Sequence, residues 1–220
     1  MTFETSRDAA LRAFLQLLET THFERIDLLD VAEHSGVPLP ELRAAFASRR
    51  DLLAAFFKAT DRQVLAASDQ DFTDETAQER LFEVLMRRLD ALEPHKEAVR
   101  ALMRSARRNP PLALLLLELS VKSQTWMLAA ARLPASGLAG AVRARGLALL
   151  FGRVLDVWLD EEDPGLSRTM ATLDRELANG AKLLGILDDL AYLARPWRIE
   201  RRRRDVPPVT EEPGTADAAA

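Results

Sequence analysis

The residue types that carry most enzyme chemistry are scarce in this sequence. It contains no Cys, and its three histidines, His22, His34 and His95, are far apart and lack HExxH spacing. No GxSxG, P-loop or GxGxxG motif occurs, and no Ser/His/Asp arrangement has the spacing of a known enzyme family. The acidic residues fall on the polar faces of predicted helices. We therefore expect a protein that is not an enzyme and that needs no metal ion and no cofactor.

Arginines are the remaining candidates for chemistry. The basic residues are 26 Arg and 4 Lys, and a guanidinium binds phosphates and carboxylates with two parallel hydrogen bonds. Genomic codon bias explains the same excess of Arg. Residues 195–204 hold six Arg and one acid, and residues 205–220 hold four acids and no base. We expect residues 195–220 to be a disordered tail that is first basic and then acidic.

The tail also has a possible partner. Trp197 and the run Arg201–Arg204 could give a weak contact with an anionic membrane surface. The alternatives are a solvated basic tail or one that adds non-specific affinity for DNA.

The elements that must position any site are predicted to be helices. Apolar residues recur at spacings of three and four nearly throughout, and no run of alternating β-branched residues occurs. We predict an all-α fold of about nine helices, with one domain over residues 1–65 and a second over residues 66–194. Hydrophobic residues make up 48% and charged residues 29% of the chain, as in ordinary globular proteins. We expect no signal peptide, no membrane span and a cytoplasmic location.

Residues 6–57 carry the pattern of a helix-turn-helix. A short helix begins at Asp27 and ends at a turn with Gly36, and a second short helix over residues 38–45 precedes the apolar anchor Phe46. The pattern resembles the N-terminal DNA-binding domain of the TetR family of transcriptional regulators. The resemblance is carried by Ala9-Ala10, Phe14, Phe23-Glu24, Asp30-Val31-Ala32-Glu33, Ser35-Gly36-Val37, Leu42, Phe46, Ser48-Arg49 and Leu52-Leu53.

The resemblance implies a DNA-binding homodimer that is controlled by a small apolar ligand. The residues that would contact double-stranded operator DNA are Pro38, Leu39, Pro40, Glu41, Arg43, Ala44, Arg49 and Arg50. The sequence departs from the family at Asp27, where the family often has Thr or Ser, and at Leu29, where it usually has Arg. Residues 1–65 hold eight basic and ten acidic residues, and phosphate neutralisation supplies much of the affinity for DNA. The alternative, that the framework is kept for folding and base reading is lost, stays open.

The second half of the chain also resembles the ubiquinone-biosynthesis accessory proteins that have the TetR fold. Three segments carry this likeness, and they are Arg87–His95, Thr125–Met127, and Glu162–Pro164 followed by Leu173–Leu177. Those proteins are dimers that bind isoprenoid lipids. The alternative function is therefore that of a lipid-binding accessory protein that no longer binds DNA.

Small residues recur every four positions in the helix that follows Ser136. Such a ridge lets a second helix approach closely, and the resemblance places the dimer contact in the last two long helices. We expect the dimer interface at Gly140, Ala144, Ala148, Gly152, Leu173, Leu177 and Leu184. Packing of the ridge within the monomer is the alternative.

The resemblance further implies an apolar pocket between the middle helices. Met and Trp side chains adapt to apolar ligands, and each candidate is also an ordinary core residue. The candidates for the pocket wall are Met86, Met103, Leu116, Trp126 and Phe151.

Overall fold

The computed structural model describes residues 2–67 and 75–193. These residues form nine α-helices and two 3-10 turns and contain no strand, which confirms the all-α prediction. In chain order the elements are α1 (Thr2–Thr20), η1 (Phe23–Arg25), α2 (Leu28–Ser35), α3 (Leu39–Ala45), α4 (Arg49–Ala66), α5 (Ala77–Leu92), η2 (Glu93–His95), α6 (Lys96–Ala106), α7 (Pro110–Ala130), α8 (Gly137–Leu159) and α9 (Ser167–Leu193).

Several helices begin and end where the sequence predicts. The Asp27 carboxylate accepts hydrogen bonds from the backbone N–H groups of Leu29 and Asp30, and the Asp30 carboxylate accepts one from the Asp27 backbone in return. Gly36 ends α2 with a φ of 69°, a left-handed conformation that costs Gly little because it has no Cβ. Ser48 precedes α4, and its side chain makes no capping hydrogen bond.

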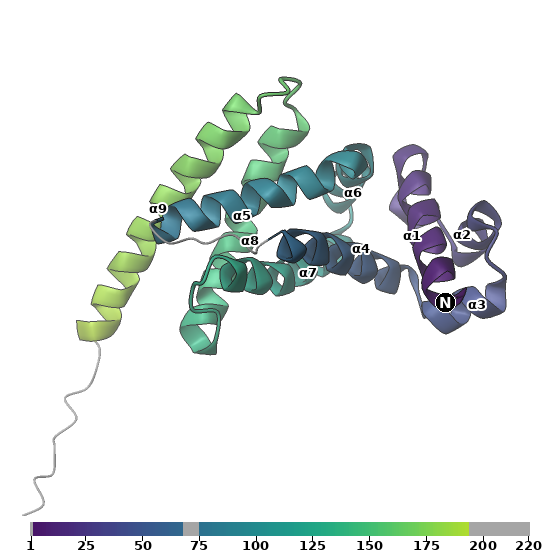
Figure 1. Cartoon of the computed structure of the whole chain (residues 1–220), viewed down its shortest axis with the longest axis horizontal. Helices are drawn as coiled ribbons and strands as arrows, with labels where there is room; N and C mark the ends of the chain where they lie inside the picture. Colours follow the sequence, from purple (N-terminus) through teal and green to yellow (C-terminus); the bar gives the residue numbers. More distant parts are fainter. Residues whose placement is uncertain (1, 68–74, 194–220) are drawn as a thin grey trace, which may run out of the picture.

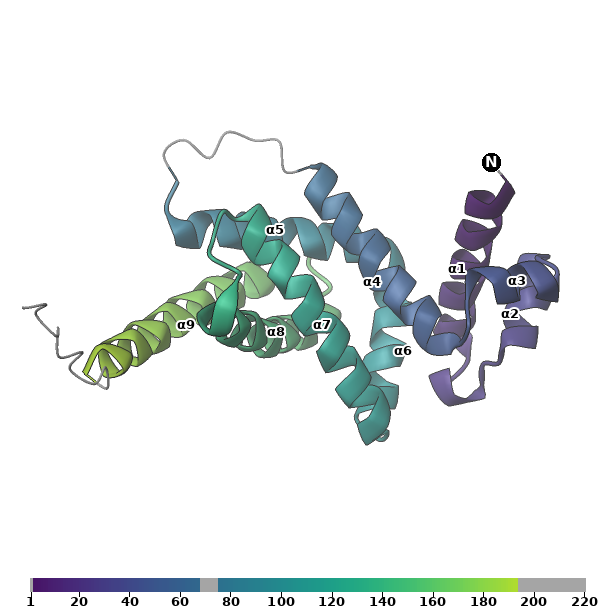
Figure 2. The same cartoon turned by 90° about the horizontal axis from the view of Figure 1, so that it is seen from below.

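The molecule consists of a small head and a larger helical body (Figures 1 and 2). The head is formed by α1, α2 and α3 at one end, and α4 runs from the head into the body. In the body, α7 packs against both α4 and α8, and α8 packs against α9. Helix α6 lies between the two parts, with α1 and η1 on one side and α7 on the other.

One continuous hydrophobic core runs through both parts. In the head, Phe14, Leu42 and Phe46 are buried, and in the body Leu89 and Trp158 are among the largest fully buried side chains. Burial of this apolar area is the main favourable term in folding. The head and the body therefore share one hydrophobic core and pack directly against each other.

The ridge of small residues on α8 packs in large part inside the single chain. A Cβ atom on Gly140 would lie 2.3 Å from the carbonyl carbon of Ala135. Ala144 and Ala148 are buried in the same chain, and so are the two predicted interface residues Leu173 and Leu177 of α9. Four-residue spacing shows that side chains share a helix face, but it does not show which neighbour that face meets. The side chain of Leu184 and the tail residues Trp197 and Arg201–Arg204 lie outside the described residues.

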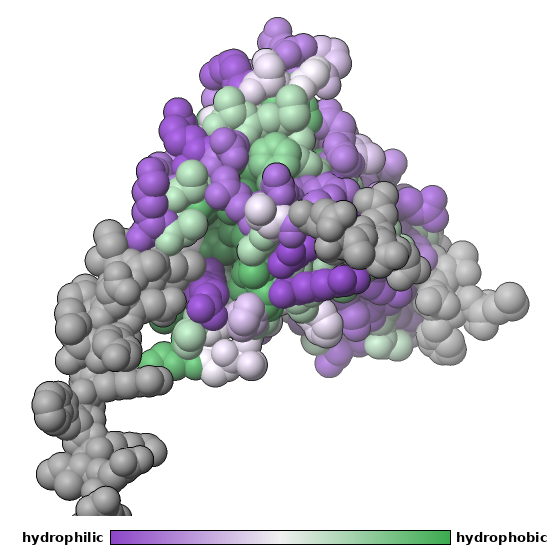
Figure 3. All heavy atoms as spheres, turned by 60° about the vertical axis from the view of Figure 1, so that its left-hand side comes forward, coloured by the Kyte–Doolittle hydropathy of each residue, from purple (hydrophilic) through white to green (hydrophobic). Residues whose placement is uncertain are grey.

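Helix α7 is strongly apolar. Among the described residues it is the one helix that is long and apolar enough to cross a membrane by length and composition alone. It packs against α4, α5, α6 and α8, as the central helix of a helical body does. On the side of the molecule seen in Figure 3, apolar side chains also reach the surface between polar ones.

Candidate DNA-binding head and ligand cavity

The head presents α3 as its exposed helix. Buried Leu42 and Phe46 hold α3 against α1 and α2. Six predicted DNA-contact residues of this segment are exposed, and they are Pro38, Leu39, Pro40, Glu41, Arg43 and Ala44. Arg43 makes no hydrogen bond or ion pair with any described residue, so its guanidinium is available to a phosphate. The Glu41 carboxylate accepts a hydrogen bond from the Ser6 hydroxyl at 3.0 Å, which directs one acid of α3 back to α1.

Arg49, one of the predicted DNA-contact residues, has a structural role within the head. Its Nη1 donates hydrogen bonds to the backbone carbonyls of Phe23, Glu24 and Ile26 at 2.9, 2.9 and 2.8 Å. The guanidinium also lies over the Phe23 ring, 5.2 Å from its centroid. A cation at the end of η1 satisfies carbonyls that lack helical partners. Arg49 therefore fastens the start of α4 to the chain after α1.

The charged side chains of Asp27 and Arg7 also form hydrogen bonds within the head. The Asp27 carboxylate accepts hydrogen bonds from backbone N–H groups at the N-terminus of α2. These N–H groups would otherwise be available to a phosphate. Arg7 donates a hydrogen bond to the Ala45 carbonyl at 3.2 Å and lies over the Phe46 ring. Of the predicted cations, Arg43 and the exposed Arg50 remain on the surface.

Arg50 lies close enough to the body to act on an acid of α7. Hydrogen bonding to Lys122 and, to a smaller extent, the charge of Arg50 lower the pKa of Glu118. The Lys122 ammonium donates to the Glu118 carboxylate at 2.7 Å. Arg50 therefore sits at the junction between the head and the body.

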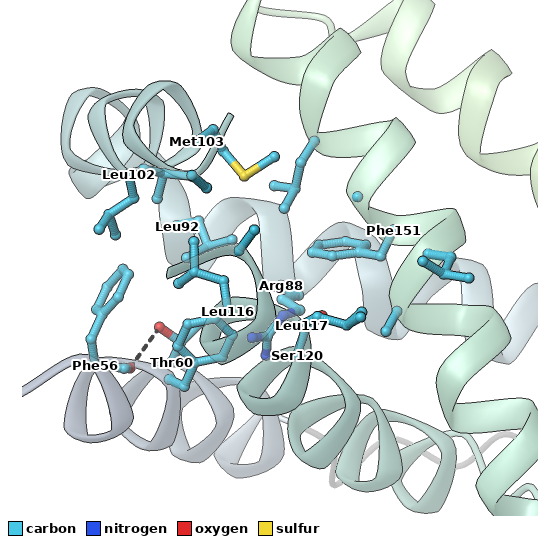
Figure 4. A pocket seen from close by; sticks show the side chains of 18 residues that line it. Phe56, Thr60, Arg88, Leu92, Leu102, Met103, Leu116, Leu117, Ser120 and Phe151 are labelled. Atoms are coloured by element: carbon cyan, nitrogen blue, oxygen red, sulfur yellow. Dashed lines mark hydrogen bonds between the residues drawn. The ribbon is translucent and has the colours of Figure 1, made fainter. Parts of the chain in front are cut away.

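The body contains a partly open apolar cavity of about 260 Å³. Helices α4, α5, α6, α7 and α8 contribute its wall (Figure 4). Met103, Leu116 and Phe151 line it, as predicted from the sequence. Met86 and Trp126 do not line it, and Trp126 is 57% exposed on the outer side of α7. The small α8 residues Ala148 and Gly152 form part of the wall and leave room for a ligand.

Three residues of the cavity wall, Phe56, Thr60 and Arg88, were not predicted from the sequence. Phe56 and Thr60 on α4 line the wall together with the buried Arg88 of α5. A signal for them exists in the sequence, because Phe56 and Thr60 are one helical turn apart and Arg88 interrupts an otherwise apolar helix face.

Arg88 is the one charged residue among the described residues that line this cavity, and it is 3% exposed. Its Nη1 forms a short ion pair with the buried Asp61 carboxylate of α4. The same Asp61 oxygen accepts a hydrogen bond from the Ser123 hydroxyl at 2.5 Å. Burial lowers the pKa of Arg88, and the charge of Asp61 opposes that shift. The pairing compensates two charges that would be costly to bury alone.

Helix α6 connects the cavity to the head. Leu102 and Met103 line the cavity, and the same helix packs against α1 and η1. Immediately after α6, the side-chain amide of Asn109 donates a hydrogen bond to the Glu24 carboxylate at 2.8 Å. The side-chain oxygen of Asn109 accepts a hydrogen bond from the Leu112 backbone N–H and so caps α7. The hydrogen bond from Asn109 lowers the pKa of Glu24, against the opposing effect of burial. Helix α6 and the start of α7 therefore both contact the head directly.

Comparisons with known proteins identify the fold. No protein-family model and no curated protein matches the sequence. A solved structure of a TetR transcriptional regulator from Nitrosomonas europaea ATCC 19718 is similar, with a TM-score of 0.62 and 24% identity over 80% of this chain and 97% of that one. A TetR transcriptional regulator from Rhodococcus sp. RHA1 is similar with a TM-score of 0.57 and 19% identity, over 82% of this chain and 97% of that one. The chain therefore has the fold of TetR regulators, as its sequence resemblance implied.

Proposed function

We propose that this protein is a cytoplasmic DNA-binding transcriptional regulator whose affinity for its operator changes when a small apolar ligand occupies the cavity. The observation that carries the proposal is the position of α6, which lines the cavity and also packs against α1 and η1 of the head. The similar solved structures are TetR transcriptional regulators. This similarity to transcriptional regulators supports the function proposed for this chain.

The ligand changes DNA affinity only if it binds two states of the protein unequally. Met103 and Leu102 face the cavity from α6, and Asn109 joins the end of α6 to Glu24 of the head. A ligand that pushes Leu102 and Met103 away from the cavity would also displace α1 and η1, because both pack against α6. A coupling of 1–3 kcal/mol, about 5- to 150-fold in affinity, is typical of such linkage.

We further propose that the protein acts as a homodimer, which brings two heads to one operator. One face of α8 carries exposed apolar side chains, with Leu138 85%, Val142 42% and Leu149 58% exposed, and Leu149 also lines the rim of the cavity. Gly146 lies on the same face and has open space around it. An exposed apolar face is typical of a protein interface, and a twofold interface pairs the same patch of both copies. The proposed interface thus lies on the face of α8 opposite the small-residue ridge.

The dimer proposal is tested by the double variant Leu138→Glu, Val142→Glu. Light scattering should give a dimer for the native chain and a monomer for the variant at the same concentration. The matched control is Ala129→Glu on the exposed side of α7, which should leave the dimer intact. A native monomer, or a double variant that stays dimeric, would contradict the proposed surface.

DNA binding is tested by selection from a random double-stranded library, together with the DNA upstream of the protein's own gene. The expected result is a selected sequence with twofold symmetry, because two heads in a dimer read two half-sites. Arg43→Ala should weaken the binding, because each head loses one phosphate contact. Recovery of no sequence would contradict the regulator.

A second candidate function is favoured by the way the head uses its charges. Arg7 and Arg49 are occupied by backbone carbonyls, and Asp27 covers the N-terminus of α2. A head that has lost phosphate contacts while the cavity remains fits a lipid-binding accessory protein of the kind that serves ubiquinone biosynthesis. Mass spectrometry of lipid extracted from the purified protein, beside the DNA selection, separates the two functions. An isoprenoid lipid in the extract with no selected DNA would favour this candidate.

A further inference from the structure

The mostly apolar wall of the cavity contains the guanidinium of Arg88, whose hydrogen-bonding capacity is only partly used. Among the described residues, only Nη1 of the Arg88 guanidinium makes hydrogen bonds, to Asp61 and weakly to the Met127 sulfur. Nε is buried and has no hydrogen-bond partner. Figure 4 shows the guanidinium on the same side of the cavity as Thr60 and Ser120. A buried donor without an acceptor costs free energy comparable to a lost hydrogen bond.

The surroundings hold this guanidinium in place. Its central carbon lies 5.9 Å from the centroid of the Phe57 ring and 5.8 Å from that of the Phe151 ring, and both rings line the cavity. Cation–π contacts of this kind orient a guanidinium. Asp61 is fixed in turn by Ser123. The donor is thus preorganised, which lowers the entropy cost of binding an acceptor.

The charge of Arg88 is already balanced. Asp61 is 8% exposed and pairs with it inside the body, so the pair brings no net charge to the wall. A ligand carboxylate would put a second anion beside the same buried guanidinium, and an uncompensated buried charge is costly. A neutral acceptor satisfies the free N–H without that cost.

We propose that the ligand of this cavity is an apolar molecule with one neutral carbonyl-type acceptor, such as a ketone, ester or quinone, whose oxygen accepts a hydrogen bond from the Arg88 guanidinium. This inference rests on the proposed function, because it names the chemical class of the ligand that controls the regulator. Thr60 does not compete for the ligand as a donor, since its hydroxyl donates to the Phe56 carbonyl at 3.1 Å.

The test compares three ten-carbon probes, methyl octyl ketone, decanoate and decane, by displacement of N-phenylnaphthylamine from the full chain without DNA. The key variant is the pair Arg88→Met, Asp61→Asn, which removes both charges together and leaves the Asn oxygen to accept from Ser123. The control pair is Arg107→Met, Asp156→Asn, which removes an exposed Arg–Asp ion pair of 3.0 Å away from the cavity wall.

The expected result is a loss of about fivefold or more in ketone affinity for the cavity pair, because the bound carbonyl is left unpaired. Decane affinity should change by less than about twofold, since no hydrogen bond to decane is lost. The control pair should change neither. On the native chain, the ketone should bind more tightly than decanoate at neutral pH. Equal losses for ketone and decane, tighter binding of decanoate, or no binding of any probe would each overturn the inference.

A second measurement needs no variant and so does not depend on the variant's folding. The carbonyl stretch of isotope-labelled methyl octyl ketone, bound to the native chain, should lie at lower frequency than in an alkane solvent. An alkane-like frequency would overturn the hydrogen bond to Arg88. Failure of the regulator is distinguishable, because a chain that binds the ketone as expected and selects no DNA keeps the ligand class and loses the regulatory function.

Discussion

Two glycines on the same ridge of α8 should respond in opposite ways to the same substitution. Gly152 lies in the cavity wall, and a Cβ there meets no atom within 4 Å. Gly140 lies against the preceding loop, and a Cβ there comes 2.3 Å from both the carbonyl carbon and the carbonyl oxygen of Ala135. Both positions are inside one helix, so the gain in helix propensity from Gly to Ala, about 0.5–1 kcal/mol, is shared.

The difference between the two variants therefore isolates the packing. Gly152→Ala should raise the melting temperature by about 1–4 °C, since 1 kcal/mol corresponds to roughly 2–4 °C in a chain of this size. Gly140→Ala adds an overpacking cost of about 1–3 kcal/mol because backbone atoms must move. It should melt at least about 2 °C below Gly152→Ala.

The assay is differential scanning calorimetry at one chain concentration, with light scattering on both variants. Fixed concentration matters because association shifts the apparent melting temperature. Both variants should keep the oligomeric state of the native protein. Equal melting temperatures would refute the burial of the ridge, and so would a loss of dimer in both variants, which is the result expected if the ridge were the interface.

Four other substitutions test three further parts of the structure. Arg49→Ala should lower the melting temperature by several degrees, because a charged donor with three carbonyl acceptors is lost. The control Arg43→Ala should leave the melting temperature unchanged. Calorimetry of both variants tests this prediction. Burial raises the pKa of Glu161, but hydrogen bonds from the Thr169 hydroxyl and from two backbone N–H groups outweigh it and lower the pKa. The ionised Glu161 carboxylate therefore stabilises the fold at pH values above the ordinary Glu pKa. This contribution to stability is lost as the pH falls through the lowered pKa. Native protein and Glu161→Gln should therefore differ in melting temperature at neutral pH and converge in acid, and a constant difference would contradict the assignment. Gln124 is fully buried and neither polar atom of its side-chain amide has a hydrogen-bond partner among the described residues, so Gln124→Leu should raise the melting temperature by about 2 °C or more, and a lower value would contradict this reasoning.

The helices could be predicted because their signals are local. Asp27 and Thr76 form capping boxes with acids three residues later, and Gly36 supplies the left-handed turn. Each of these depends on residues within one turn of the chain. Met103, Leu116 and Phe151 were predicted for the cavity because they are apolar residues of middle helices.

The remaining features depend on which elements meet, and local spacing does not contain that information. Arg49 bonds to carbonyls more than 20 residues earlier, so its residue type alone suggested a phosphate contact. Arg88 and Asp61 come from different helices, and neither has a neighbour in sequence that signals the pair. The small residues of α8 share a face, but only the packing shows that this face turns toward the cavity and the preceding loop.

The salt dependence of binding to the selected double-stranded DNA tests the central claim most directly. With Arg43 and Arg50 as phosphate contacts in each of two heads, the logarithm of the binding constant should fall against the logarithm of salt concentration with a slope of about −3 to −4. Arg43→Ala should make that slope shallower by about 2, because a dimer loses two contacts. A slope near zero, or no binding at low salt, would contradict the account of this protein as a DNA-binding regulator.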